Sequence, residues 1–120
     1  MEFAERERKE AEKLKEKINK FNEVVKKAKE ANTIEELDQL EKEAIRINKE
    51  GRKLAGDIDA VRAMRERLEK IYAGGKIEKE EMMKEESERL KKEVEASMRF
   101  QEQLKKFFEV QRKRIKEKYN

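Results

Sequence analysis

The stretch Ala31-Asn32-Thr33-Ile34-Glu35-Glu36 decides the fold, because it ends one helical segment and begins the next. Thr33 and Glu36 form a capping box, in which the threonine hydroxyl accepts a hydrogen bond from the Glu36 amide and the glutamate reaches back toward the amide of the cap. Asn32 suits the left-handed conformation that closes a preceding helix. Such a short reversal predicts two antiparallel helices, one on each side of it.

A second break lies at Ala73-Gly74-Gly75-Lys76. Two adjacent glycines end a helix readily, because glycine takes the left-handed conformation of a helix C-terminus without strain. Glu78, Glu80 and Glu81 then favour the first turn of a following helix, where the positive end of the helix dipole stabilises carboxylates. The two breaks predict three helices, over about residues 2–31, 34–73 and 77–118.

Each predicted helix carries apolar residues at alternating spacings of three and four, the pattern of a helix that buries one stripe. The stripe of the first helix is Ala4, Glu7, Ala11, Leu14, Ile18, Phe21, Val25 and Ala28. That of the second is Leu37, Leu40, Ala44, Ile47, Gly51, Leu54, Ile58 and Val61; it fails at Arg65 and resumes one step over as Met64, Leu68 and Ile71. That of the third is Met83, Ser87, Leu90, Val94, Ser97, Gln101, Leu104, Phe108, Gln111 and Ile115. Three stripes on closely connected helices predict an all-α fold, an antiparallel up-down-up three-helix bundle forming one domain over residues 1–120.

The composition limits the classes of function. The 120 residues include 33 Lys and Arg and 29 Asp and Glu, a net charge of +4, and no Cys or His. The chain therefore lacks thiol nucleophiles, thiolate and imidazole metal ligands, and the usual catalytic base. We expect no enzyme activity, no cofactor and no metal site. No apolar run reaches the roughly 20 residues of a membrane span, and the N-terminal residues lack the apolar segment of a signal peptide, so the cytoplasm is the expected compartment.

A candidate binding surface follows from the register of the helices. A turn near residue 32 places residue i of the first helix opposite about residue 64 − i of the second, so the first helix ends opposite about residue 62. The hairpin of the second and third helices then projects beyond it with more apolar residues than two helices can cover. The predicted partner-binding residues are Met64, Leu68, Ile71, Met82 and Met83. Methionine-rich patches adapt to varied protein partners or to a second copy; alternatively, these side chains cover one another at the end of the hairpin.

Polar residues and glycines on the stripes leave alternatives open. The third stripe contains four polar residues, which are Ser87, Ser97, Gln101 and Gln111. They lie at the solvent edge of the stripe, or pair across helices and fix the register, or line an open groove for a fourth helix. Gly51 and Gly56 in the second helix either allow a close approach of a neighbouring helix or mark a small pocket.

A second class of partner follows from charge. The last predicted turn is basic and contains Arg112, Lys113, Arg114, Lys116 and Lys118. Such a cluster can bind nucleic acid or another anionic surface. Cations are also favourable there without any ligand, because the C-terminal end of a helix carries negative partial charge. Nucleic-acid binding is therefore the alternative to a protein-interaction function.

The Thr33-x-x-Glu36 cap, the Gly74-Gly75 break and the three stripes resemble a computationally designed or redesigned three-helix bundle. Such proteins have Glu- and Lys-rich surfaces, deliberate helix caps and binary patterning, without cysteine or proline. Gly51, Gly56 and the five methionines depart from the idealised pattern, as a redesigned natural bundle or a scaffold carrying a grafted helix would. The resemblance implies a non-catalytic scaffold or protein-interaction module. The Lys and Glu enrichment is also similar to that of hyperthermophile proteins, which implies thermostability.

Overall fold

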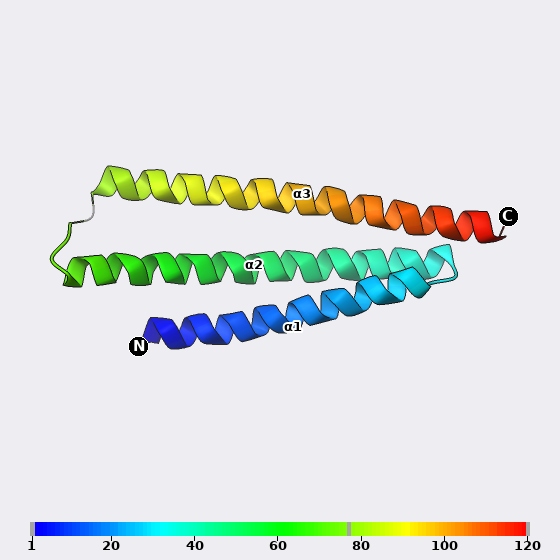
Figure 1. The fold of residues 1–120 in the computed structure, drawn as a ribbon, viewed down its shortest axis with the longest axis horizontal. Coiled ribbons are helices and arrows are strands. Elements are labelled where there is room, and N and C mark those ends of the chain that lie inside the picture. The colour runs from blue at the N-terminus through cyan, green and yellow to red at the C-terminus, as the bar shows by residue number, and fades with distance from the viewer. Residues whose placement is uncertain (1, 77, 120) are drawn as a thin grey trace.

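The computed structural model of the protein describes residues 2–76 and 78–119, which form three helices. They are α1 (Glu2–Glu30), α2 (Ile34–Tyr72) and α3 (Lys79–Tyr119). Successive helices run antiparallel along the longest dimension of 69 Å (Figure 1). The predicted all-α, up-down-up three-helix bundle is confirmed, with helix ends within two residues of the prediction. Residue 77, where the third helix was expected to begin, lies outside the described residues.

The capping box at the start of α2 forms as its sequence predicts, with one difference. Thr33 Oγ1 accepts a hydrogen bond from the Glu36 amide at 3.1 Å, and Glu36 Oε2 accepts one from the Asn32 amide at 3.3 Å. The glutamate thus reaches one residue further back than the cap. Among the described residues, only a glycine has a positive φ, so the left-handed Asn32 expected from the sequence is wrong. The end of α1 is closed by another part of the chain instead.

A side chain of α3 binds the C-terminal carbonyl groups of α1. Arg114 Nη2 donates hydrogen bonds to the carbonyl oxygens of Ala31 at 2.9 Å and Ala28 at 3.3 Å, and its Nε donates to Gln111 Oε1. The guanidinium adds a donor to the Ala28 carbonyl, which also accepts a hydrogen bond from the Ala31 amide at 3.4 Å, and it places positive charge at the negative end of the helix dipole. Arg114 therefore ties the end of α3 to the first hairpin.

The two glycines end α2 in a Schellman motif. The Gly75 amide donates to the Lys70 carbonyl at 2.9 Å, and the Gly74 amide donates to the Ile71 carbonyl at 3.0 Å. Gly74 has a φ of +86°, a conformation that side-chain-bearing residues rarely adopt. The local chemistry of these residues therefore fixes where α2 ends.

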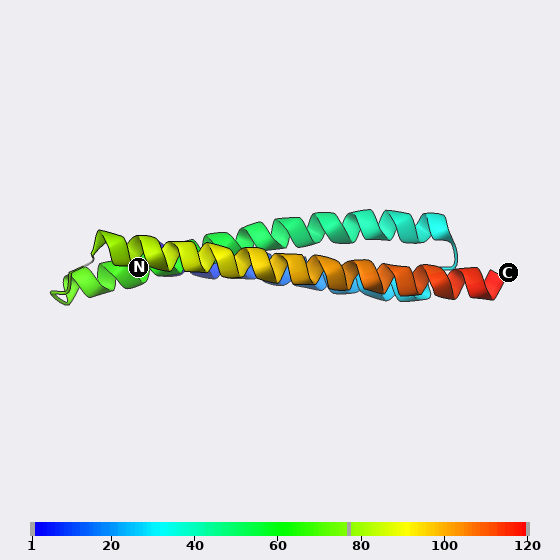
Figure 2. The same cartoon turned by 90° about the horizontal axis from the view of Figure 1, so that it is seen from above.

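The buried core lies at one end of the bundle, which we call the closed end, beside the turn at residues 31–33. Its residues are Val24, Ala28, Ala31, Leu37, Leu40, Ala44, Ile47, Leu104, Phe108 and Ile115. There the three helices form a triangle, whereas toward the opposite, open end they spread into a flat layer with α2 in the middle (Figures 1 and 2). In the open half, Ile58 and Val61 of α2 remain buried, and α1 stays beside α2 while α3 lies on its other side.

Replacing Arg114 by methionine should lower the free energy of unfolding by about 1–2 kcal/mol, because the carbonyl groups of Ala28 and Ala31 lose charged donors in a partly buried site. Urea unfolding followed by far-ultraviolet circular dichroism measures the change. Lys113→Met is the matched control on the exposed side of the same turn and should change stability by less than about 0.5 kcal/mol. Equal effects of the two substitutions would contradict a helix-capping role for Arg114.

Candidate interaction surface

The α2–α3 hairpin projects beyond the N-terminal end of α1, as the register predicted (Figure 1). The projection is shorter than expected. Lys17 of α1 binds Glu50 of α2, and Glu7 binds Arg65, which places α1 about one to two helical turns further along α2 than predicted. The end of the hairpin, with Gly74 and Gly75, remains beyond the cover of α1.

Four of the five residues predicted to bind a partner have exposed side chains. Met64, Leu68 and Ile71 follow one another at spacings of four and three on one side of α2, with exposed fractions of 51%, 36% and 51%. On α3, Met83 is 61% exposed. Met82 is half-buried instead and lines a cavity of about 210 Å³ between α2 and α3. The two methionines therefore lie in different surroundings, one in the helix interface and one on the surface.

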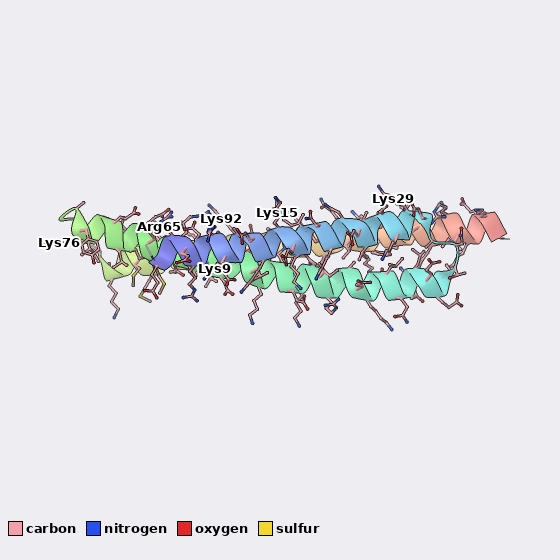
Figure 3. All side chains as sticks on the ribbon, turned by 90° about the horizontal axis from the view of Figure 1, so that it is seen from below. Lys9, Lys15, Lys29, Arg65, Lys76 and Lys92 are labelled. Atoms are coloured by element: carbon pink, nitrogen blue, oxygen red, sulfur yellow. The ribbon has the colours of Figure 1, made fainter. Side chains whose placement is uncertain are left out.

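The charged residues that interrupt the stripes of α1 and α2 bind one another. Glu7 Oε2 accepts a hydrogen bond from Arg65 Nη1 at 2.8 Å, and Glu7 Oε1 accepts one from Arg62 Nε at 2.9 Å. Figure 3 shows Arg65 beside the N-terminal end of α1. The α1–α2 interface therefore continues through Arg65, further than expected, and Met64 lies outside it on the exposed side, as predicted. Met64 lies outside the interface because an ion pair occupies the next position along it.

The first half of α3 carries exposed apolar residues whose heptad spacing predicts a buried stripe. Leu90 and Val94 are 52% and 58% exposed, whereas Leu104 and Phe108, two heptads later in the same helical phase, are 7% and 0% exposed. The prediction of one continuous buried stripe is therefore wrong for this half of the helix. We call Met83, Leu90, Val94 and Met98, all more than half exposed, the exposed α3 stripe.

Charged side chains connect this half of α3 to α2. Glu86 accepts hydrogen bonds from Arg67 Nη2 at 2.7 Å and Arg89 Nη2 at 2.8 Å, and Arg89 Nη1 also donates to Glu93 at 2.9 Å. The hydrogen bonds from Arg89 and Arg67 hold the pKa of Glu86 below its ordinary value. Because these contacts use other positions of α3, the apolar stripe is left uncovered.

A groove between α2 and α3 runs beside the exposed α3 stripe. It consists of two adjoining cavities of about 580 and 630 Å³, which share Arg52 and Ser97 in their lining. Gly56 and Val94 line the first cavity, and Ile45 lines the second. The groove thus offers some apolar surface next to an uncovered helix face, between lining residues that are mostly charged or polar.

Gly51 lies in a spacious part of the bundle. A Cβ added there would lie 3.8 Å from Leu14 Cδ1 and 3.9 Å from Lys17 Cβ, which are ordinary van der Waals distances. The residue lines a cavity of about 330 Å³ that α1 and α2 form together with Phe100 of α3. Of the two alternatives, a close helix approach or a small pocket, the geometry at Gly51 matches the pocket.

The basic C-terminal turn is partly engaged within the bundle. Arg112 donates hydrogen bonds to the carboxylates of Glu41 at 3.1 Å and Asp38 at 2.9 Å, and these bonds raise the pKa of the guanidinium. Arg114 binds the end of α1, as described above. Arg112 and Arg114 of the predicted anion-binding cluster therefore have partners on other helices.

Comparison of the chain with protein-family models, with curated proteins and with solved structures found no match. In the part of the chain that the structure describes, the helices contain no segment long and apolar enough to cross a membrane. The function is therefore inferred from the surfaces described above.

Acid should weaken the attachment of α3 to α2. Because the pKa of Glu86 is lowered in the folded state, its contribution to stability is present above the ordinary glutamate pKa of about 4.3. That contribution is lost as the pH falls through the lower pKa of the folded state. Thermal unfolding at neutral and at acidic pH measures the effect. The melting temperature of Glu86→Gln should fall less over the same pH interval than that of the wild type. An equal fall in the two proteins would contradict a stabilising role for the ionised Glu86.

Replacing Gly51 by alanine should raise the free energy of unfolding by about 1 kcal/mol, because the methyl group fits and alanine is the better helix former. Thermal unfolding measures the change as a higher melting temperature. Gly74→Ala is the control and should lower stability by about 1 kcal/mol, since alanine is strained at a positive φ. Destabilisation by Gly51→Ala would show that the helices need a glycine at this crossing.

Proposed function

We propose that this protein is a non-catalytic helical scaffold that binds another protein chain through the apolar helix surface of its open half. One observation carries the proposal: Leu90 and Val94 occupy the heptad positions of the buried Leu104 and Phe108, yet more than half of each side chain is exposed. Such a stripe has the residue types and the spacing of a helix–helix interface. Exposed apolar surface of this kind is typical of helix-in-groove recognition.

The neighbouring surface supports the same function. Met64 and Ile71 add exposed apolar area on α2, and Met83 and Met98 do so on α3. Methionine side chains are flexible and polarizable, so they adapt to the shape of a partner. The deliberate helix caps and the Lys- and Glu-rich surface add support, because they are typical of designed or redesigned bundles that serve as scaffolds.

The proposal is tested with an apolar fluorescent dye, such as anilinonaphthalene sulfonate, at low micromolar protein concentration. We expect dye fluorescence to fall several-fold in the Leu90→Glu/Val94→Glu variant, because charged side chains remove the apolar surface. Val110→Glu is the matched control, since Val110 is 62% exposed but does not belong to the exposed α3 stripe. Circular dichroism checks that each variant keeps its helices.

Equal dye fluorescence in the wild type and the double variant would contradict an apolar binding surface on α3. The alternative function is tested on the same variants by fluorescence anisotropy with a labelled DNA duplex. Because Arg112 and Arg114 bind other helices, we expect no saturable binding. Affinity that decreases steeply with salt and is lost in Lys113→Glu/Lys116→Glu would replace the proposed function with nucleic-acid binding.

A further inference from the structure

The exposed α3 stripe and the charges beside it identify one partner among the protein chains that could cover it. We infer that the partner is a second copy of this chain, paired antiparallel along the first half of α3 about a two-fold axis near residue 93. The inference rests on the proposed function, because it assigns the occupant of the same apolar surface.

The two central apolar residues of the stripe, Leu90 and Val94, are placed so that an antiparallel copy can cover them. With the axis near residue 93, Leu90 of each copy lies within about one helical turn of Val94 of the other. Met83 to Met98 span about 22 Å along the helix, at a rise of about 1.5 Å per residue. Around this axis Leu90 and Val94 of the two copies meet, as an isologous two-fold interface requires, whereas Met83 lies opposite Gln103.

Charges along one border of the stripe favour the antiparallel orientation. Lys84 and Lys91 precede the axis, and Glu95 and Glu102 follow it. All four are exposed, and spacings of seven and four place them along the same side of the helix. An antiparallel copy brings Lys91 opposite Glu95 and Lys84 opposite Glu102. In a parallel two-fold pair, this border of one helix lies on the opposite side of the interface from the same border of the other, so these ion pairs do not form. Glu88, also on this border, faces the apolar Met98.

The groove between α2 and α3 provides the additional area that a stable dimer needs. Stable interfaces bury about 800 Å² on each partner, more than one helix pair of this length supplies. Gly56 and Ile45 line the groove beside the stripe, so the α3 helix of one copy can contact both α2 and α3 of the other. The result is a four-helix arrangement of the two α2–α3 hairpins around one shared apolar seam.

Sedimentation velocity over a wide concentration range tests the pairing on the full chain. We expect a concentration-dependent dimer whose dissociation constant rises roughly tenfold in Lys91→Glu, because the axis repeats the altered ion pair twice. The double variant Lys91→Glu/Glu95→Lys should recover the wild-type constant, since both partners change sign together. Lys113→Glu, at the closed end, is the matched control and should leave the constant unchanged. A charge reversal that the double variant does not rescue would overturn the proposed register.

Single cysteines test the orientation, because the chain contains no cysteine of its own. Val94→Cys lies near the axis and should form a disulfide-linked dimer on mild oxidation. Met83→Cys should not, because the axis separates the two sulfur atoms by about 30 Å. Crosslinking of both variants to the same extent would indicate a parallel pair and overturn the inference.

A chain that stays monomeric at the highest attainable concentration would also overturn the self-pairing. The proposed function would then be judged separately by the dye experiment. Dye binding that depends on Leu90 and Val94 in a monomer leaves a binding surface for a different protein. Failure of both experiments overturns the inference and the function together.

Discussion

The burial of Phe108 at the closed end is the constraint on which the rest of the structure depends. Phe108 and Leu37 are the largest fully buried side chains among the residues that the structure describes, and Phe107 packs edge-on against Phe108 with ring centroids 5.2 Å apart. Ala28 and Ala44 are also fully buried, and their small side chains let the helices converge around the aromatic ring. Arg114 binds the end of α1 at this same point, so apolar burial and helix capping stabilise one junction.

The sequence predicted the helix ends because their chemistry is local. Thr33 and Gly74 act through hydrogen bonds within a few residues of themselves, and both form as expected. Glu7 and Arg65 were visible in the sequence only as separate interruptions of two stripes. Their pairing depends on the register between helices, which loop lengths fix only to within about one or two turns. An ion pair that completes the α1–α2 interface therefore appears as two unrelated charged interruptions when the stripe of each helix is considered alone.

The sequence also could not predict which part of the α3 stripe another helix covers, and the reason is different. Heptad phase identifies the side of a helix that carries apolar residues, but it does not say whether a helix of the same chain reaches that side. Leu90 and Leu104 share this phase and differ completely in burial. The only hint in the sequence was that polar residues, Ser87 and Gln101, interrupt the stripe, which indicates that this part of it is exposed to solvent. The candidate site was thus only half predicted, at Met64, Leu68, Ile71 and Met83.

The uncovered stripe also determines where stability is lowest. The ion pair between Arg67 and Glu86 joins this half of α3 to α2 through side chains that are 24% and 33% exposed, and an ion pair near solvent contributes only about 0–1 kcal/mol. The first half of α3 therefore has little apolar burial holding it to α2, unlike the second half around Phe108. A partner that covers Leu90 and Val94 adds burial to this weakest segment, and binding to the folded state alone stabilises that state by mass action. Occupation of the surface and ordering of this half of α3 are thus thermodynamically linked, while the closed end folds on its own core.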